Sequence, residues 1–275
     1  MNHVPASRPR ALTIAGSDSG GGAGIQADLK TFSALGVYGT TAVTAITVQN
    51  TEGVSGYEPV PPDVVGAQIR AVVTDIGVDA AKTGMLASAA IVDAVADAVA
   101  ETRVPNLVVD PVFVSKHGHV LLAPEAVGVL RSRILPLATI VTPNLPEAAG
   151  LADLEVATRD DMRRAADVLL EAGARAVLIK GGHLEDGSGV SADLFVDATG
   201  QEWVTADRID TPHTHGTGCT LSAAIAAHLA RGSGLLEAVR AAKTFVTEAI
   251  RHALPLGHGI GPVDQLWPIP PEGLA

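Results

Sequence analysis

The chain has 275 residues, of which 47% are hydrophobic and only 3% aromatic, and its formal net charge is −11. A surface this acidic argues against general binding to nucleic acid or to anionic membranes, although backbone amides can still bind an anion locally. The single cysteine, Cys219, excludes an intrachain disulfide and fits a reducing compartment. The first ten residues lack the apolar run of a signal peptide, and no apolar stretch reaches membrane-spanning length. We therefore expect a soluble, cytoplasmic protein.

Short apolar strands alternate with helices along almost the whole chain. Strands are expected at residues 11–15, 40–48, 107–111, 138–142 and 176–180, with a hairpin from 194–198 and 201–205. Helices are expected at 25–35, 63–76, 88–100, 159–171, 217–231 and 234–252. This alternation is typical of βαβ units and predicts an α/β fold, with a mostly parallel sheet covered by helices on both faces.

The chain shows no Pro/Ser-rich linker and no internal repeat. We therefore expect a single domain over residues 11–266, preceded by a flexible segment at 1–10 and followed by a loose tail at 267–275.

Polar and glycine-rich clusters follow the expected strands, where ligands of open α/β sheets bind. They are Gly16-Ser17-Asp18 with Gly20-Gly21-Gly22, Gln49-Asn50, Lys82-Thr83-Gly84-Met85, Asp110-Pro111, Asn144 with Glu147, and Lys180-Gly181-Gly182-His183. Six such clusters on one rim predict a shared cleft.

The segment Thr214-His215-Gly216-Thr217-Gly218-Cys219-Thr220 runs directly into an apolar helix. Such a turn leaves backbone N–H groups unpaired at the positive end of the helix dipole, which suits a phosphate or a transferring phosphoryl group. A flexible turn before a packed helix is the simpler alternative. The chain contains no P-loop segment, no dinucleotide fingerprint and no zinc-type cluster.

Several motifs together resemble those of the hydroxymethylpyrimidine/phosphomethylpyrimidine kinases of thiamine biosynthesis. The resemblance extends from about residue 11 to 262 and rests on the motifs at 15–30, Val48-Gln-Asn-Thr51, Lys82-Thr-Gly-Met-Leu86, Thr142-Pro-Asn-Leu-Pro-Glu147, Ile179-Lys-Gly-Gly-His183 and Thr214-His-Gly-Thr-Gly-Cys219. It implies a ribokinase-like three-layer α/β/α sandwich. One departure is the loop Ser19-Gly20-Gly21-Gly22, which lacks the usual proline of this family.

The resemblance implies that Gly216, Thr217, Gly218 and Cys219 form an anion hole over the transferred phosphoryl group, because such transfer depends on positioned donors. Related sugar kinases have an aspartate base where Cys219 stands. A helix N-terminus lowers a thiol pKa, so we expect Cys219 to accept the proton of the substrate hydroxyl. The alternative is a small, half-buried helix residue.

Gln49 is the expected reader of the substrate, because its amide has both a donor and an acceptor for an aminopyrimidine. By resemblance, Met85 packs against the ring, and Gly16 and Asp28 belong to the same substrate site. Asp28 could equally cap its helix or pair near Lys30.

Glu147 and Asp110 are the expected metal residues, since Mg²⁺ prefers few carboxylates together with phosphate oxygens and water. Asn144 and Glu147 also fit a capping box. Five further residues are expected to bind the nucleotide or the transferred phosphate: Lys180, Lys116, Asn144, Thr214 and His215. His215 could instead bond only to the neighbouring loop.

The resemblance implies an enzyme that uses Mg-ATP to phosphorylate 4-amino-5-hydroxymethyl-2-methylpyrimidine and then its monophosphate. It also implies a homodimer. A pyridoxal or pyridoxine kinase of the same superfamily is the nearest alternative, and a non-catalytic pyrimidine sensor is a second. A redox protein built on Cys219 would need a resolving cysteine, which the chain lacks.

Overall fold

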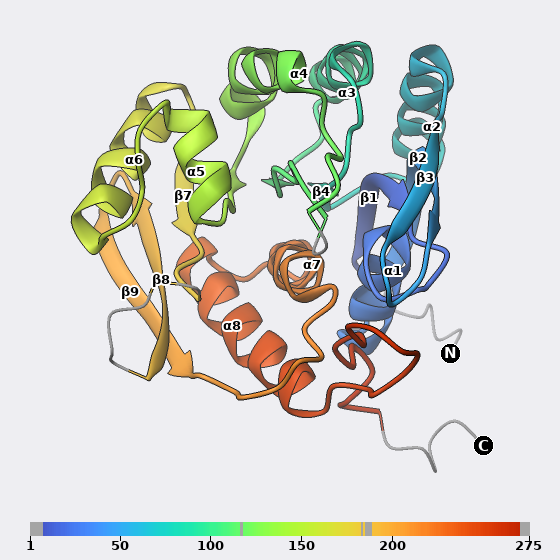
Figure 1. The fold of residues 1–275 in the computed structure, drawn as a ribbon. Helices are drawn as coiled ribbons and strands as arrows, with labels where there is room; N and C mark the ends of the chain where they lie inside the picture. The colour runs from blue at the N-terminus through green and yellow to red at the C-terminus, as the bar shows by residue number, and fades with distance from the viewer. Residues whose placement is uncertain (1–7, 116–117, 183, 185–188, 270–275) are drawn as a thin grey trace, which may run out of the picture.

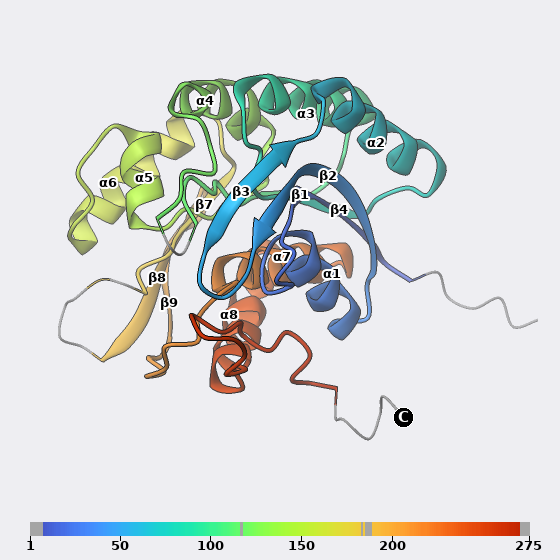
Figure 2. The same cartoon turned by 45° about the vertical axis from the view of Figure 1, so that its right-hand side comes forward.

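The computed structural model describes residues 8–115, 118–182, 184 and 189–269. Within these residues a nine-stranded sheet has the order β3-β2-β1-β4-β5-β6-β7-β8-β9 (Figures 1 and 2). The strands are β1 (Arg10–Ser17), β2 (Tyr38–Gln49), β3 (Val54–Pro59), β4 (Ala80–Thr83), β5 (Leu107–Val109), β6 (Ile140–Val141), β7 (Ala176–Ile179), β8 (Val190–Asp197) and β9 (Gly200–Asp207). The six strands from β2 to β7 in this order run parallel, and β3, β8 and β9 are antiparallel to their neighbours.

Two groups of helices cover the two faces of the sheet (Figure 1). One face packs against α2 (Pro62–Asp75), α3 (Ala89–Thr102), α4 (Pro124–Val129), α5 (Leu145–Ala152) and α6 (Arg159–Glu171). The other packs against α1 (Gly24–Ala34), α7 (Thr217–Ala230) and α8 (Leu235–Arg251). A π-helix, η1 (Leu130–Ile134), and a 3₁₀-helix, η2 (Leu135–Leu137), follow α4. The predicted three-layer α/β/α architecture is confirmed.

Helix α7 lies directly on the sheet and is buried almost all round. Its buried residues occupy nine of the fourteen positions, and four of the nine are alanine. Small side chains let the helix axis approach the strands closely, which places its N-terminal turn near the carboxyl ends of the central strands.

The sequence predicted most of the helices within one or two residues and missed several shorter elements. Strand β3 is an exposed edge strand, so it has no buried run. Strand β4 is only four residues long and contains a lysine. The segment 124–137 changes from α- to π- to 3₁₀-helix, which breaks any single periodicity.

Regular structure and packing continue just beyond residues 11 and 266. Arg10 begins β1 and forms an ion pair with Asp79 over 2.8 Å. Trp267 packs against Phe245 and stacks on His252. No helix in the described part of the chain is both long and apolar enough to cross a membrane.

Candidate functional site

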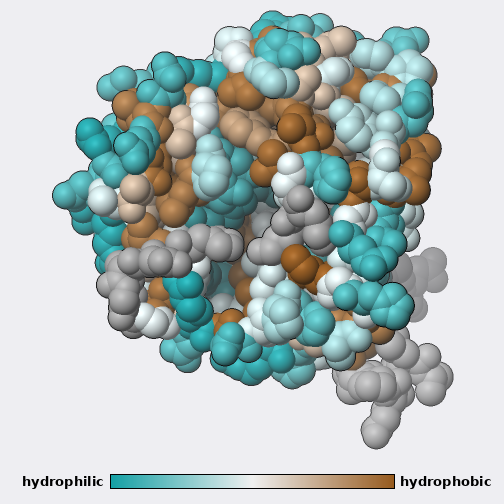
Figure 3. Space-filling model, in the orientation of Figure 1, coloured by the Kyte–Doolittle hydropathy of each residue, from teal (hydrophilic) through white to brown (hydrophobic). Residues whose placement is uncertain are grey.

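The side chains at the carboxyl ends of the parallel strands gather beside the first turn of α7. Figure 3, drawn in the orientation of Figure 1, shows that the surface is hollowed near its centre, close to that turn. The polar residues here form three connected groups, centred on Lys180, Lys82 and His215. A separate groove of about 510 Å³ lies between β9 and α8. None of the residues predicted for the site lines it.

The turn before α7 depends on glycine. Gly216 is the N-cap residue, with a left-handed φ of 83°, and a Cβ atom there would lie 1.9 Å from the carbonyl oxygen of Gly22. Thr217 Oγ1 donates to the carbonyl oxygen of Thr214 over 2.8 Å and closes the turn. Among the described residues no side chain caps this helix. The backbone N–H of Thr217 donates to the carbonyl oxygen of Thr214 over 3.4 Å, so the next N–H groups, those of Gly218 and Cys219, are the ones open to an anion.

Gly218 brings the first turn of α7 against a cluster of charges. A Cβ atom at Gly218 would lie 3.4 Å from Lys180 Nζ and 3.8 Å from Asp110 Oδ2. A phosphoryl group at the turn would therefore lie close to this lysine and this carboxylate.

Lys180, which directly follows β7, lies between two carboxylates. Its Nζ donates to Asp110 Oδ1 over 2.9 Å and lies 3.7 Å from Glu147 Oε2. Ser222 on α7 also donates to Asp110, over 3.2 Å. Burial alone would lower the pKa of Lys180, but the charges of Asp110 and Glu147 outweigh burial and raise it. The lysine therefore keeps its charge and links β7, β5 and α5.

Glu147 takes part in the capping box predicted from Asn144. The Asn144 side chain accepts from the Glu147 backbone, and Glu147 Oε2 accepts from the Asn144 backbone over 2.8 Å. Burial raises the pKa of Glu147 to about 7, against the lowering effect of Lys180 and with a further increase from Asp110. The pKa of Asp110 is lowered, because the two lysines outweigh burial. Of the two carboxyl groups, Glu147 is the one that titrates near neutrality.

Asp28 on α1 forms a fully buried ion pair with Lys82 on β4. Lys82 Nζ donates to both carboxylate oxygens, over 2.9 and 3.1 Å, and Thr13 Oγ1 donates to the same carboxylate over 2.6 Å. Both charged side chains are 0% exposed. The nearby Lys30 donates instead to the backbone of Gly21. Asp28 therefore pairs with a residue that the sequence analysis did not select.

Cys219 lies in the first turn of α7 and is partly exposed. Burial raises the pKa of its thiol to about 11, with Lys82 lowering it and Asp28 and Asp110 raising it. The expected decrease in the thiol pKa is wrong, because loss of hydration and the two carboxylates outweigh the favourable charges. The free protein holds Cys219 as a neutral thiol.

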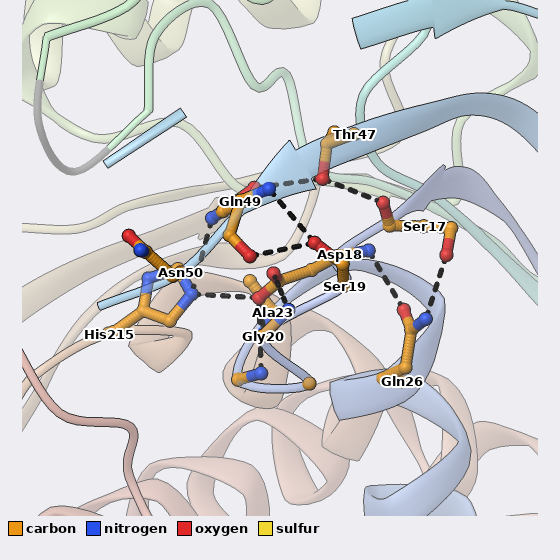
Figure 4. A network of polar contacts seen from close by, with 12 residues as sticks. Ser17, Asp18, Ser19, Gly20, Ala23, Gln26, Thr47, Gln49, Asn50 and His215 are labelled. Atoms are coloured by element: carbon orange, nitrogen blue, oxygen red, sulfur yellow. Dashed lines mark hydrogen bonds and ion pairs between the residues drawn. The ribbon is translucent and has the colours of Figure 1, made fainter. Parts of the chain in front are cut away.

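The third group, centred on His215, joins the glycine-rich loop at residues 18–23 to the end of β2 (Figure 4). Asp18 accepts from the backbone of Gly20, Gly22 and Ala23, and its Oδ2 lies 2.9 Å from His215 Nε2. Burial would raise the pKa of Asp18, but these hydrogen bonds lower it overall. The same His215 Nε2 lies 3.4 Å from Gln49 Nε2. His215 therefore bonds to the loop, as one of its two interpretations proposed.

Two other predicted residues lie in contact with each other. Met85 is buried, and a Cβ atom at Gly16 would lie 3.1 Å from its sulfur. Lys116 lies outside the described residues.

The described residues contain no group of three or more His, Cys, Asp or Glu side chains placed to hold a metal ion. Asp110 and Glu147 form the nearest carboxylate pair, with Lys180 between them. A donor set of this kind fits a Mg²⁺ ion that keeps most of its waters and binds phosphate oxygens.

Asp18 and Lys82 belong to the site but were not among the residues predicted for it. Both lie in the quoted motifs. One feature could have indicated Lys82: a lysine directly after Ala80 and Ala81 must be paired if that segment is buried. No comparable signal marked Thr13 or Ser222, whose contacts depend on the tertiary structure.

The chain is similar to known kinases in both sequence and structure. The family model described as phosphomethylpyrimidine kinase matches residues 18–264. A hydroxymethylpyrimidine/phosphomethylpyrimidine kinase of Streptomyces coelicolor is 54% identical over 263 residues, which cover 96% of each chain. An ADP complex of Bacillus subtilis pyridoxal kinase superposes with a TM-score of 0.87 at 44% identity, covering 94% of this chain and 98% of that one. A phosphomethylpyrimidine kinase structure from Clostridium difficile gives a TM-score of 0.78 at 44% identity, covering 88% and 100%.

Proposed function

Because the chain belongs to the phosphomethylpyrimidine kinase family, we propose that it transfers the γ-phosphoryl group of ATP to 4-amino-5-hydroxymethyl-2-methylpyrimidine. It then phosphorylates the monophosphate to the diphosphate, for thiamine biosynthesis. The observation that carries the proposal is the uncapped first turn of α7, held against Lys180 and Asp110. This turn joins a backbone anion site to charged groups, which is what phosphoryl transfer requires.

The residues around the turn divide the work of the reaction. Backbone N–H groups of Gly218 and Cys219 bind the oxygens of the transferred group, and Thr217 closes the turn by donating to Thr214. Lys180 contacts the phosphate chain from the end of β7. Holding the acceptor hydroxyl in line with the γ-phosphate supplies much of the rate acceleration.

Cys219 lies where it can receive the proton of the acceptor hydroxyl. With a pKa of about 11, its thiolate is scarce at neutral pH but strongly basic once formed. A loose transition state delays the need for proton removal until the new bond is nearly complete.

The Mg²⁺ that accompanies ATP would be held near Asp110 and Glu147. When bound, it neutralises phosphate charge and polarises the transferred group. Because Lys180 already pairs with the two carboxylates, they would orient the ion through its water molecules. Asn144 holds Glu147 in position for this task.

The acceptor ring lies against Met85 and Gly16, with Gln49 at its polar edge. Gln49 ends β2 and is partly exposed, so its amide can reach a ligand. Asp28 and Lys82 are both 0% exposed, so their ion pair supports this pocket from beneath and does not itself contact the acceptor.

The alternative acceptor is pyridoxal, which also has a hydroxymethyl group on an aromatic ring. The high structural similarity to the Bacillus subtilis pyridoxal kinase favours this possibility.

ADP release with Mg-ATP, measured with each acceptor in turn, tests the proposal. We expect the pyrimidine to be preferred and to yield two ADP per molecule. A preference for pyridoxal would assign the protein to the vitamin B6 kinases, and no release with either acceptor would contradict a kinase role.

A homodimer and a cytoplasmic location remain predictions. Sedimentation equilibrium of the purified chain tests the first, and fractionation of cells that produce the protein tests the second.

A further inference from the structure

The imidazole of His215 faces two polar groups with the same nitrogen. Its Nε2 lies 2.9 Å from Asp18 Oδ2 and 3.4 Å from Gln49 Nε2 (Figure 4). His215 and Asp18 are 7% and 3% exposed, so water competes little for these contacts. The protonation of this nitrogen therefore decides what Gln49 can do.

Asp18 requires a proton on His215 Nε2. Its carboxylate already accepts three backbone N–H groups, at 2.8, 3.0 and 2.8 Å. These donors stabilise its ionised form, which has no proton to give. A bare imidazole nitrogen 2.9 Å from an anionic oxygen would be repelled, so Nε2–H must donate to Asp18. This holds whether the ring is neutral or doubly protonated.

A protonated Nε2 cannot accept from the amide nitrogen of Gln49, since both groups would then be donors. A second conflict lies at the other end of the same amide. Thr47 Oγ1 lies 2.9 Å from the carbonyl oxygen of Ser17 and 3.3 Å from Gln49 Oε1. The hydroxyl has one proton and cannot donate it to both acceptors.

A half-turn of the Gln49 amide about its last bond removes both conflicts. The amide oxygen then accepts from His215 Nε2–H, and the amide nitrogen donates to Thr47 Oγ1, whose own proton goes to Ser17. We propose that Asp18 and His215 are positioning residues that fix the Gln49 amide in this orientation and so select an acceptor with an amino group beside its hydroxymethyl group. The selection rests on the proposed function, whereas the orientation of the amide does not.

The fixed amide presents an ordered edge to a ligand. Among the described residues its side chain has no other polar partner, so one lone pair and one N–H remain available. The oxygen lies on the side of His215, which immediately precedes the α7 turn. A hydroxymethyl group directed at that turn places its ring neighbour next to the amide oxygen.

In the aminopyrimidine that neighbour is an amino group, which donates to the oxygen, and the adjacent ring nitrogen accepts the amide N–H. In pyridoxal the neighbour is an aldehyde, whose oxygen can only accept. Two acceptors would then face each other, and a site built for a donor rejects such a ligand. The orientation of one amide therefore separates the two candidate acceptors.

The tautomer of His215 is measured directly on the wild-type protein. Two-bond ¹⁵N–¹H correlation NMR of histidine-labelled protein near neutral pH, with His215→Gln as the assignment control, shows which nitrogen has the proton. We expect a protonated Nε2. A bare Nε2 with the proton on Nδ1 would overturn the proposal, and this result requires no enzymatic activity.

The selection is measured as the ratio of kcat/KM for the natural pyrimidine to that for its analogue without the amino group. We expect His215→Leu to lower this ratio about tenfold, the effect of one misplaced hydrogen-bonding pair. His215→Gln keeps an N–H donor at the same reach and should preserve the ratio. The double variant with Gln49→Leu should show no further loss beyond Gln49→Leu alone.

His213→Leu is the matched control for the loop, because His213 bonds to Gly261 and not to Gln49. We expect it to leave the ratio unchanged. If His215→Leu slows both acceptors equally and leaves the ratio intact, the positioning role is wrong although the proposed function stands. If the wild-type protein phosphorylates neither acceptor, the proposed function fails while the NMR result still decides the orientation.

Discussion

The buried pair between Asp28 and Lys82 offers the sharpest test of how this site is held together. Lys82→Met replaces the ammonium group with an apolar side chain of similar length. Both charged groups are 0% exposed, so water cannot replace the lost partner without opening the structure. Asp28 would keep only Thr13 as a side-chain donor among the described residues.

The magnitude follows from leaving one buried charge unpaired. Breaking a buried ion pair from one side costs about 3–5 kcal/mol, a large part of the roughly 5–15 kcal/mol that stabilises a typical domain. Burial already raises the pKa of Asp28 with Lys82 present. Without the lysine, burial acts with less opposition and raises it further.

The pH dependence has a defined sign. A carboxyl group whose pKa is higher in the folded than in the unfolded state binds its proton more tightly when folded. Stability is therefore lost as pH rises from the unfolded to the folded pKa, by about 1.4 kcal/mol per pH unit. We expect Lys82→Met to be more destabilising at pH 8 than at pH 5.

Urea unfolding followed by fluorescence of Trp203 and Trp267 measures these differences at both pH values. The matched variant is Asp28→Asn/Lys82→Met, which removes both charges and should regain at least half of the lost stability. Arg240→Met, which breaks an exposed pair with Glu202, is the control and should cost less than about 1 kcal/mol. Equal stability of the single and double variants at both pH values would refute the argument.

Three further predictions concern catalysis. We expect kcat to rise about tenfold per pH unit between pH 7 and 9, because only the Cys219 thiolate accepts a proton and its pKa is about 11; a flat profile would exclude the base role. Gly216→Ala should lower kcat at least about a hundredfold, because its Cβ would meet a carbonyl oxygen at 1.9 Å. Gly232→Ala is the control: it shares the left-handed φ, but no atom lies within 4 Å of the added Cβ, so turnover should stay normal. The kcat/KM for ATP should decrease as the pH is lowered below about 7, because Glu147, with a pKa of about 7, becomes protonated. Glu147→Gln should abolish this pH dependence; if the dependence persists in the variant, another group is responsible for it.

The helices were the best predicted part of the fold, because their apolar spacing and caps are local. Ser88 accepts from the Ile91 backbone as the N-cap of α3, and α6 spans Arg159–Glu171 as expected. The short strand β4 lacks such a signal. Its residues Ala-Ala-Lys-Thr are all buried, but alanine and lysine are poor indicators of a strand.

In the candidate site, too, the features that depend on local sequence were predicted and those that depend on tertiary contacts were not. Sequence spacing placed polar residues at strand ends, and the structure brings Asp110, Glu147 and Lys180 together there. The partner of Asp28 and the pKa of Cys219 could not be predicted, because both depend on which side chains meet across the sheet. A helix N-terminus alone suggested a lowered thiol pKa, whereas burial and neighbouring carboxylates reverse the direction.

The open N–H groups of the α7 turn, rather than the charged side chains beneath it, explain how so acidic a chain could hold an anion. Lys82 is paired with Asp28, and Lys180 with Asp110, so each lysine is already largely neutralised in the free protein. Glu147, whose pKa is about 7, is only about half ionised at neutrality, and the charge that it has is negative. The attraction for an incoming phosphoryl group must therefore come mainly from the open N–H groups of the turn, which need no net positive charge. A net charge of −11 spread over the chain is screened within about 8–10 Å at ordinary ionic strength and does not oppose this local field.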